Sequence, residues 1–166
     1  ADTLTNIMKA QNKVKVLSSL EQAGNYALSR MEQEIRKAEK ITCCESYSSS
    51  GTHCDTDPIA GTGLGILVDG KEIMYSVSVA GDTHALARTE NPGTDQEITF
   101  LTDVDNINVR TKNEFEESAS DVFRCDSSGE RVTIHLELEP LSTPQRRDFE
   151  GSVTLETTVL LRGKAY

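Results

Sequence analysis

The 166-residue chain has no tryptophan, only four phenylalanines and four tyrosines, and no long apolar run. A transmembrane helix needs about eighteen or more consecutive apolar residues, so none is expected within these residues. The sequence also begins without the basic, apolar and small-residue pattern of a signal peptide, and Ala1 is expected to be a processed or trimmed end. Charged residues make up 27% of the chain. These features predict a soluble chain, long enough for one domain with a core.

Motifs for catalysis are also missing. Gly61-Thr62-Gly63-Leu64-Gly65 lacks the following lysine and the preceding strand of a phosphate-binding loop, so we interpret it as a flexible loop between helix and sheet. There is no Gly-x-Ser-x-Gly elbow, and His53, His84 and His135 lie far apart, outside any metalloprotease or hydrolase motif. We expect no enzyme activity and no cofactor.

The four cysteines are Cys43, Cys44, Cys54 and Cys125, and they form no CxxC pair. A zinc site is therefore not indicated, because His53 stands alone beside Cys54. Four cysteines allow three connectivities, and a bond between adjacent cysteines strains the peptide that joins them. We expect Cys54 to pair with Cys43 or Cys44 and Cys125 to take the other, with buried free thiols as the alternative. Such disulfides indicate a protein exported from the cytoplasm.

Charge is divided unevenly along the chain. Residues 1–41 contain seven Lys/Arg and five Asp/Glu, a net charge of +2, whereas residues 42–166 contain ten and twenty-two, a net charge of −12. We call residues 42–166 the head. An acidic head repels phosphate backbones, so no direct nucleic acid partner is expected. The charge serves solubility, or else attracts cations or a basic partner.

Apolar residues at spacings of three and four predict one long amphipathic helix from about Leu4 to Lys40. The apolar row contains Val14, Leu17, Leu20, Gly24, Leu28, Met31, Ile35 and Ala38, and Ile7 and Met8 extend it. The water-facing side carries Lys9, Lys13, Glu21, Arg30, Glu34 and Lys37. A helix of roughly 36 residues spans about 54 Å. We therefore expect its first part, Leu4 to Leu17, to overhang the sheet and to need a partner.

The rest of the chain is predicted to be loops and strands. A cysteine-bearing loop covers residues 42–63, and an acidic, serine-rich loop at 116–130 holds Cys125. Alternating apolar residues predict strands at about 73–79, 84–90, 97–101, 106–115, 131–139 and 152–162. Strands that follow one helix, with no helix between them, indicate an α+β fold. We expect a single domain over 1–166: an amphipathic helix at 1–41, the loop at 42–63, and an antiparallel sheet with acidic loops at 64–166.

Several segments occur in an order that is typical of one family. They are the helix end at 31–38 (MEQEIRKA), Ala87-Arg88, residues 100–102 followed by 106–109, the strand 132–138, and the threonine-rich ending at 155–162. In this order the chain resembles the soluble part of a type IV pilin-like protein, most like the minor pilins and the pseudopilins of type II secretion. It departs from the family by lacking the prepilin peptidase site, the glutamate that follows the cleavage site, and the apolar N-terminal segment.

The resemblance implies a pilin-like fold and a non-enzymatic minor pilin of a type IV pilus-like filament, which primes assembly or contacts surfaces. A pseudopilin of a type II secretion system and a filament-tip adhesin stay open as alternatives. The implied partners are other pilin subunits, and the inner membrane through the missing segment. The implied location is the periplasm, membrane-anchored before assembly, and then the cell-surface filament. The residues expected to pack in the filament are Leu4, Ile7, Met8, Val14 and Leu17.

One segment is similar to part of a calcium loop. Asp103-Val104-Asp105-Asn106 lacks the glycine and the distal glutamate of that loop, so an ordinary turn is the simpler interpretation. Some pseudopilins bind calcium in the head, and the resemblance therefore keeps calcium as the metal to test. The candidate ligands are Asp103, Asp105, Glu116, Glu117 and Asp121.

Overall fold

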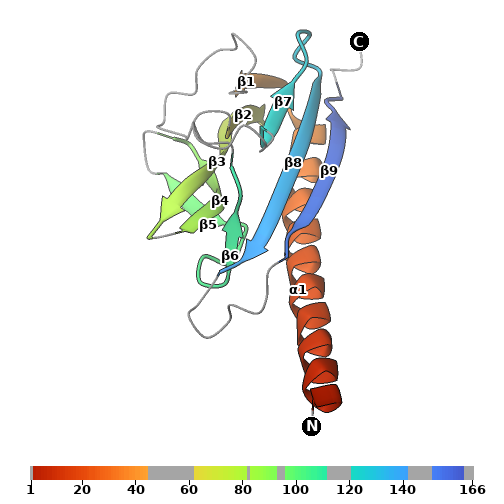
Figure 1. The fold of residues 1–166 in the computed structure, drawn as a ribbon. Helices are drawn as coiled ribbons and strands as arrows, with labels where there is room; N and C mark the ends of the chain where they lie inside the picture. The colour runs from red at the N-terminus through yellow and green to blue at the C-terminus, as the bar shows by residue number, and fades with distance from the viewer. Residues whose placement is uncertain are drawn as a thin grey trace.

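The computed structural model describes residues 2–44, 62–81, 83–92, 96–111, 121–141 and 151–162. The elements are α1 (Asp2–Lys37), β1 (Lys40–Cys44), β2 (Gly63–Val68), β3 (Lys71–Ala80), β4 (Thr83–Glu90), β5 (Glu97–Phe100), β6 (Ile107–Val109), β7 (Phe123–Cys125), β8 (Arg131–Pro140) and β9 (Val153–Leu160). The strands pair antiparallel and α1 lies against them (Figure 1). The α+β fold, with one long N-terminal helix packed on antiparallel strands, is therefore confirmed.

The helix α1 begins and ends slightly earlier than the predicted helix. Its last turn carries Arg36 and Lys37, whose charges complement the partial negative charge of a helix C-terminus. The amide of Ala38 then donates to the carbonyl of Ile35 at 3.1 Å, which tightens the last turn. The helix does not reach Lys40, because this residue begins β1 and pairs with β2.

The strands form two sheets rather than the single sheet that the sequence predicted. One sheet has five strands in the order β1-β2-β3-β4-β5. In the other, β9 pairs with residues 131–138 of β8, while β6 and β7 pair with opposite ends of β8. One hydrophobic core joins both sheets with α1. The core therefore fixes the C-terminal half of the helix against both sheets.

The C-terminal half of α1 carries the residues that pack on the head. It lies along β9 and β8 and also contacts β2, while the N-terminal half extends beyond both sheets (Figure 1). We call its buried residues the packing face: Leu20, Gly24, Ala27, Leu28, Met31 and Ile35. This confirms the prediction that the C-terminal half of the helix is buried on the strands.

At Gly24 the helix backbone approaches the second sheet closely. A Cβ atom built there would lie 2.2 Å from Leu155 Cδ1 and 3.0 Å from Leu138 Cδ1. Only glycine leaves room for these two leucines without a shift. The residue therefore serves close packing of α1 on β8 and β9.

The predicted loop at 42–63 is wrong at both of its ends, because β1 reaches Cys44 and β2 begins at Gly63. One of the glycines that suggested a flexible loop, Gly65, has a packing role. A Cβ atom at Gly65 would lie 2.4 Å from Thr42 Oγ1 and 2.6 Å from Cys43 Sγ, so the approach of β1 requires glycine. Residues 45–61 lie outside the described residues.

The long strands confirm the predicted alternation. Val132, Ile134, Leu136 and Leu138 of β8 are fully buried. In β9 buried or half-buried residues alternate with exposed ones. In β3, Val79 is 63% exposed, since it lies at the end of the β3–β4 hairpin.

The short strands differ more from the prediction. Phe123 is buried in β7, which falls inside the segment expected to be the acidic loop at 116–130. The strand expected at 106–115 is reduced to β6, and residues 112–120 lie outside the described residues. At the end of the five-stranded sheet, β5 forms as predicted, and all of its residues are exposed.

Candidate functional site

The N-terminal half of α1 projects from the head. Residues 2–15 are all exposed, and at 1.5 Å per residue this projecting half is about 20 Å long. Its large apolar side chains are Leu4 at 66% exposed, Ile7 at 51%, Met8 at 58% and Val14 at 66%. Contiguous apolar surface of this kind typically marks a site of contact with another protein or a membrane. We call these four residues the assembly surface.

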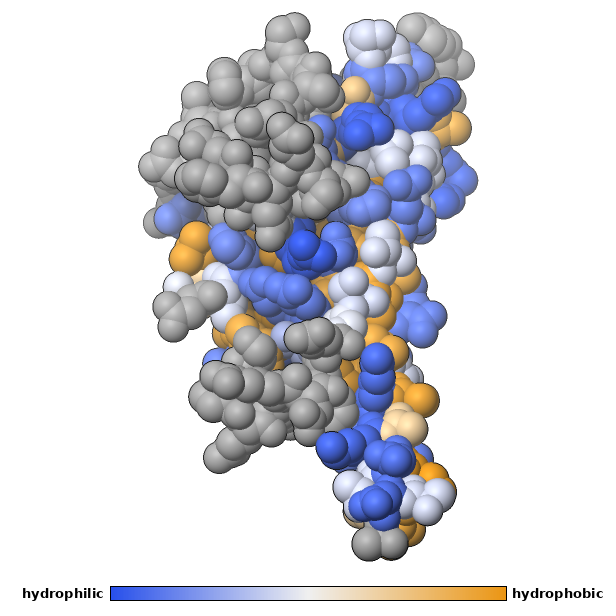
Figure 2. All heavy atoms as spheres, in the orientation of Figure 1, coloured by the Kyte–Doolittle hydropathy of each residue, from blue (hydrophilic) through white to orange (hydrophobic). Residues whose placement is uncertain are grey.

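The assembly surface points away from the side of α1 that packs on the head. At 100° per residue, the mean direction of its four side chains differs by roughly 140° from that of the packing face. Figure 2 shows apolar atoms on the side of the projecting half that is turned away from the sheets. The predicted single apolar row therefore changes face along the helix. The steps of three from Val14 to Leu17 and from Leu17 to Leu20 each rotate it by about 60°.

Leu17 lies at the boundary between the two faces. It is half-buried and packs against the core. A Cβ atom built on Gly151, just before β9, would lie 3.3 Å from Leu17 Cδ2. The head therefore partly covers Leu17 within the same chain. Filament packing by Leu17 stays a prediction, as it does for the assembly surface.

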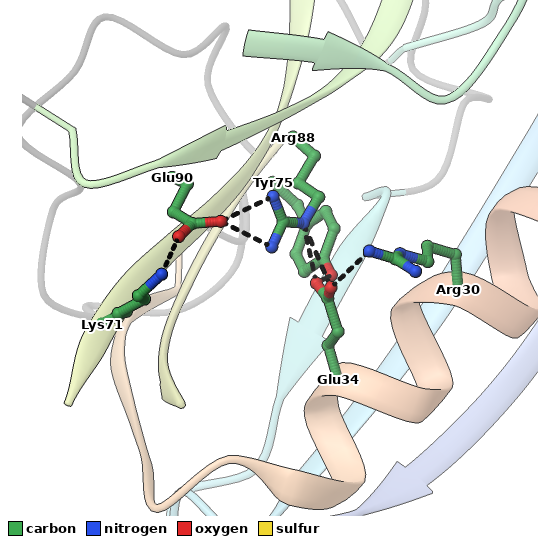
Figure 3. Close-up of polar contacts among 6 residues, drawn as sticks. All are labelled: Arg30, Glu34, Lys71, Tyr75, Arg88 and Glu90. Carbon is green, nitrogen blue, oxygen red and sulfur yellow. Dashed lines mark hydrogen bonds and ion pairs between the residues drawn. The ribbon is translucent and has the colours of Figure 1, made fainter. Parts of the chain in front are cut away.

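A polar network joins α1 to the five-stranded sheet (Figure 3). Glu34 of α1 accepts hydrogen bonds from the Tyr75 hydroxyl and from Arg88 Nε, which lies 2.9 Å and 3.2 Å from its two carboxylate oxygens. Arg30 Nη2 lies 3.2 Å from the same carboxylate. Arg88 also donates from both terminal nitrogens to Glu90 Oε2 at 3.3 Å. The network thus connects the helix with β3 and β4.

The water-facing role predicted for Glu34 is wrong, because its side chain is only 14% exposed. Its sequence position gave a signal that the prediction missed. Glu34 stands next to Ile35 and three residues after Met31, and both of these are buried. A carboxylate beside a buried stripe needs cationic or donor partners. Arg88 of β4 is the matching cation.

The electrostatics of the network favour a neutral Tyr75 and a charged Arg88. Burial, together with the hydrogen bond to Glu34, raises the pKa of Tyr75 far above its usual value. Burial opposes the charge of Arg88, but the hydrogen bond to Glu34 raises the pKa of Arg88 on balance. At the outer end, the Lys71 hydrogen bond lowers the pKa of Glu90 and Glu90 raises the pKa of Lys71. Charges of alternating sign therefore fix the C-terminal half of α1 on the sheet.

A disulfide joins the two sheets. Cys44 of β1 is bonded to Cys125 of β7, with their Cα atoms 6.4 Å apart. This confirms that Cys125 pairs with one of the two adjacent cysteines. Cys43 is also disulfide-bonded, and none of the described cysteines is free, so the alternative of free thiols is wrong for them. The predicted partner Cys54 lies outside the described residues.

The candidate calcium ligands are divided between a turn and a buried position. Asp103 accepts hydrogen bonds from the Asp105 amide at 3.0 Å and from Asn106 Nδ2 at 2.8 Å, which is the geometry of a turn. These bonds, that of Asn106 first, lower the pKa of Asp103. Asp121 is buried, and Glu116 and Glu117 lie outside the described residues. Within the described ranges, no three His, Cys, Asp or Glu residues gather as metal ligands would.

Comparison of the chain with protein-family models, with curated proteins and with solved structures gives no match. In the described part of the chain, α1 lacks the apolar run that crossing a membrane requires.

Proposed function

We propose that the chain is a non-enzymatic structural subunit, a minor pilin, of a type IV pilus-like filament. In this proposal the projecting half of α1 packs among neighbouring subunits in the filament core, and the acidic head stays outside. The observation that carries the proposal is the direction of the assembly surface. Its four side chains are exposed and face away from the head. A helix that binds its own sheets on one side and neighbours on the other needs two apolar faces of this kind.

Two further features support the proposal. The arrangement of one long N-terminal helix on antiparallel strands is the arrangement that the sequence resemblance implies. The disulfide between Cys44 and Cys125 is typical of an oxidising compartment, and a subunit that passes through the periplasm to a surface filament would fold in one. The proposal also requires an apolar anchor ahead of Ala1 in the full protein. A cleavage glycine followed by an aromatic residue and a glutamate at the fifth position would support it, and an ordinary signal peptide would count against it.

The experiment is to shear surface filaments from the cells that make the full-length chain and to measure how much of the chain they contain. The double variant Ile7→Asp/Met8→Asp is expected to fall at least about tenfold in this fraction, because burying unpaired carboxylates costs several kcal/mol. Asn6→Asp is the matched control. It adds a carboxylate at an exposed position on a different face of the projecting half, so its incorporation should match that of the parent.

The proposal fails if the parent chain is missing from the sheared filaments. It also fails if the Ile7→Asp/Met8→Asp variant enters filaments as well as the Asn6→Asp control. Both variants should keep the melting temperature of the parent domain, since Ile7 and Met8 are exposed in the single chain. A normal melting temperature thus separates lost assembly from lost folding.

A further inference from the structure

A basic depression lies at the end of the head where α1 and β9 end. It has a volume of about 650 Å³ and is lined by Gln33, Arg36, Lys37, Asp69 and Arg162. Three cations thus face one carboxylate, although the whole chain has a net charge of −10. Arg36 lies 3.9 Å from Glu32, and within the described ranges Lys37 and Arg162 form no ion pair. The depression therefore suits a partner that presents carboxylates.

An acidic turn lies at the opposite end of the head. It contains Asp103 and Asp105, both exposed, and leads into β6. The first residue of β6 pairs with Pro140, the last residue of β8. The hydrogen bonds to Asp103 hold the turn in one conformation. The two carboxylates are therefore presented at a fixed place, at the same end of the head from which α1 projects (Figure 1).

The register of β8 gives the separation of these two groups. Arg131, the first residue of β8, pairs with Leu160, two residues before Arg162 of the basic depression. The acidic turn adjoins the other end of this ten-residue strand, which at 3.3 Å per residue is about 30 Å away. The opposite charges thus lie at opposite ends of the head (Figure 1).

We propose that the acidic turn of one copy docks in the basic depression of the next copy, so that heads of this chain stack end to end. The proposal rests on the proposed filament function and names one of its partners, a second copy of the chain. Charge complementarity selects this partner, because the depression is basic and the rest of the head is strongly acidic. Two different surfaces meet in the contact, so it is heterologous and extends into a row instead of closing as a dimer. The chain would then enter filaments in runs of adjacent copies.

Disulfide trapping tests the contact directly. The full-length chain carrying both Lys37→Cys and Asp105→Cys is expressed in the filament-making cells and oxidised, and sheared filaments are analysed without reductant. A ladder of covalent multimers longer than dimers is expected, because each copy offers one thiol at each end. Neither single variant should form a ladder. The pair Lys37→Cys/Thr154→Cys, in which the second thiol is exposed on β9 outside the acidic turn, should not form one either.

The outcomes separate the two proposals. Filaments that contain the variant without a ladder, or with cross-links only to another polypeptide, overturn the end-to-end contact and leave the filament function standing. Absence of the parent chain from filaments overturns the filament function itself.

Charge reversal gives a second readout. Lys37→Glu and Asp105→Lys should each lower the amount of chain in filaments, by about two- to fivefold, as expected for exposed ion pairs. The combined variant should recover toward the parent, because the attraction is restored with its direction reversed. Arg124→Glu is the control, since this exposed arginine of β7 does not line the depression. A combined variant that is worse than both single variants would contradict the docking.

Discussion

Replacing Gly24 with alanine sets two opposing effects against each other. Alanine favours the helix by about 1 kcal/mol over glycine in a helix interior. Against this, the new Cβ atom would lie 2.2 Å from Leu155 Cδ1 and 3.0 Å from Leu138 Cδ1, where no ordinary contact fits. Forcing an extra carbon into a packed core costs about 1–3 kcal/mol. We therefore expect Gly24→Ala to destabilise the domain by about 1 kcal/mol, which corresponds to a fall of roughly 2–4 °C in melting temperature.

Thermal denaturation followed by circular dichroism measures this change. The double variant Gly24→Ala/Leu155→Val should recover part of the loss, because valine lacks the δ-carbon that meets the new Cβ atom. Ser29→Ala is the matched control, since Ser29 is exposed on α1 and gains helix propensity without a clash. If Gly24→Ala raises the melting temperature as Ser29→Ala does, Leu155 moves aside without cost and the close-packing argument is refuted.

Three further predictions concern the core, the disulfide and the polar network. Leu28→Asp puts a charge at a position that is only 7% exposed and should unfold the head, whereas Lys13→Asp on the projecting half should not. Equal melting temperatures for both variants and the parent would contradict the packing of α1 on the sheets. Replacing both Cys44 and Cys125 with alanine removes a cross-link between residues separated by 81 positions in the sequence, and should lower the unfolding free energy by up to about 4.5 kcal/mol. An unchanged midpoint of unfolding in guanidinium chloride would show that the bond does not stabilise the two sheets. The pKa of Tyr75 is raised in the folded chain, so the neutral phenol stabilises the fold; this stabilisation is fully present below the unfolded pKa of about 10 and is lost as the pH rises toward the folded pKa. Tyr75→Phe should therefore lose less stability than the parent between about pH 9 and 11. Parallel pH profiles of the two proteins would contradict this.

The parts of the fold that follow strong periodicity could be predicted from the sequence. The helix and β8 each have a repeating apolar pattern whose buried face is long, so small errors at the ends did not affect the assignment. The strand β2 was missed because its glycines, Gly63 and Gly65, are typical of a loop, while the real role of Gly65 depends on the approach of Thr42 and Cys43. Division into two sheets depends on pairing between distant segments, which no local pattern records.

The candidate site could be predicted in part. Exposure of Leu4, Ile7, Met8 and Val14 was expected from the length of the helix, and the structure confirms it. The direction of these side chains also follows from the sequence, because each residue turns the helix by about 100°. The prediction used only the spacing of three and four residues and did not sum these rotations along the helix. The network around Glu34 needed the structure, because Arg88 is distant in the sequence and is brought near only by the packing of α1 on the sheet.

Protection of the assembly surface in filaments tests the central claim most directly. The full-length Ile7→Cys variant is compared with its isolated domain by labelling with a water-soluble maleimide. Since Ile7 is 51% exposed in the single chain, the domain should label rapidly. The same cysteine in sheared filaments should label at least about tenfold more slowly, because desolvation by neighbouring helices excludes the reagent. Thr154→Cys, exposed on β9, should label equally in both states. Equal labelling of Ile7→Cys in domain and filament would contradict the assembly of this chain through α1.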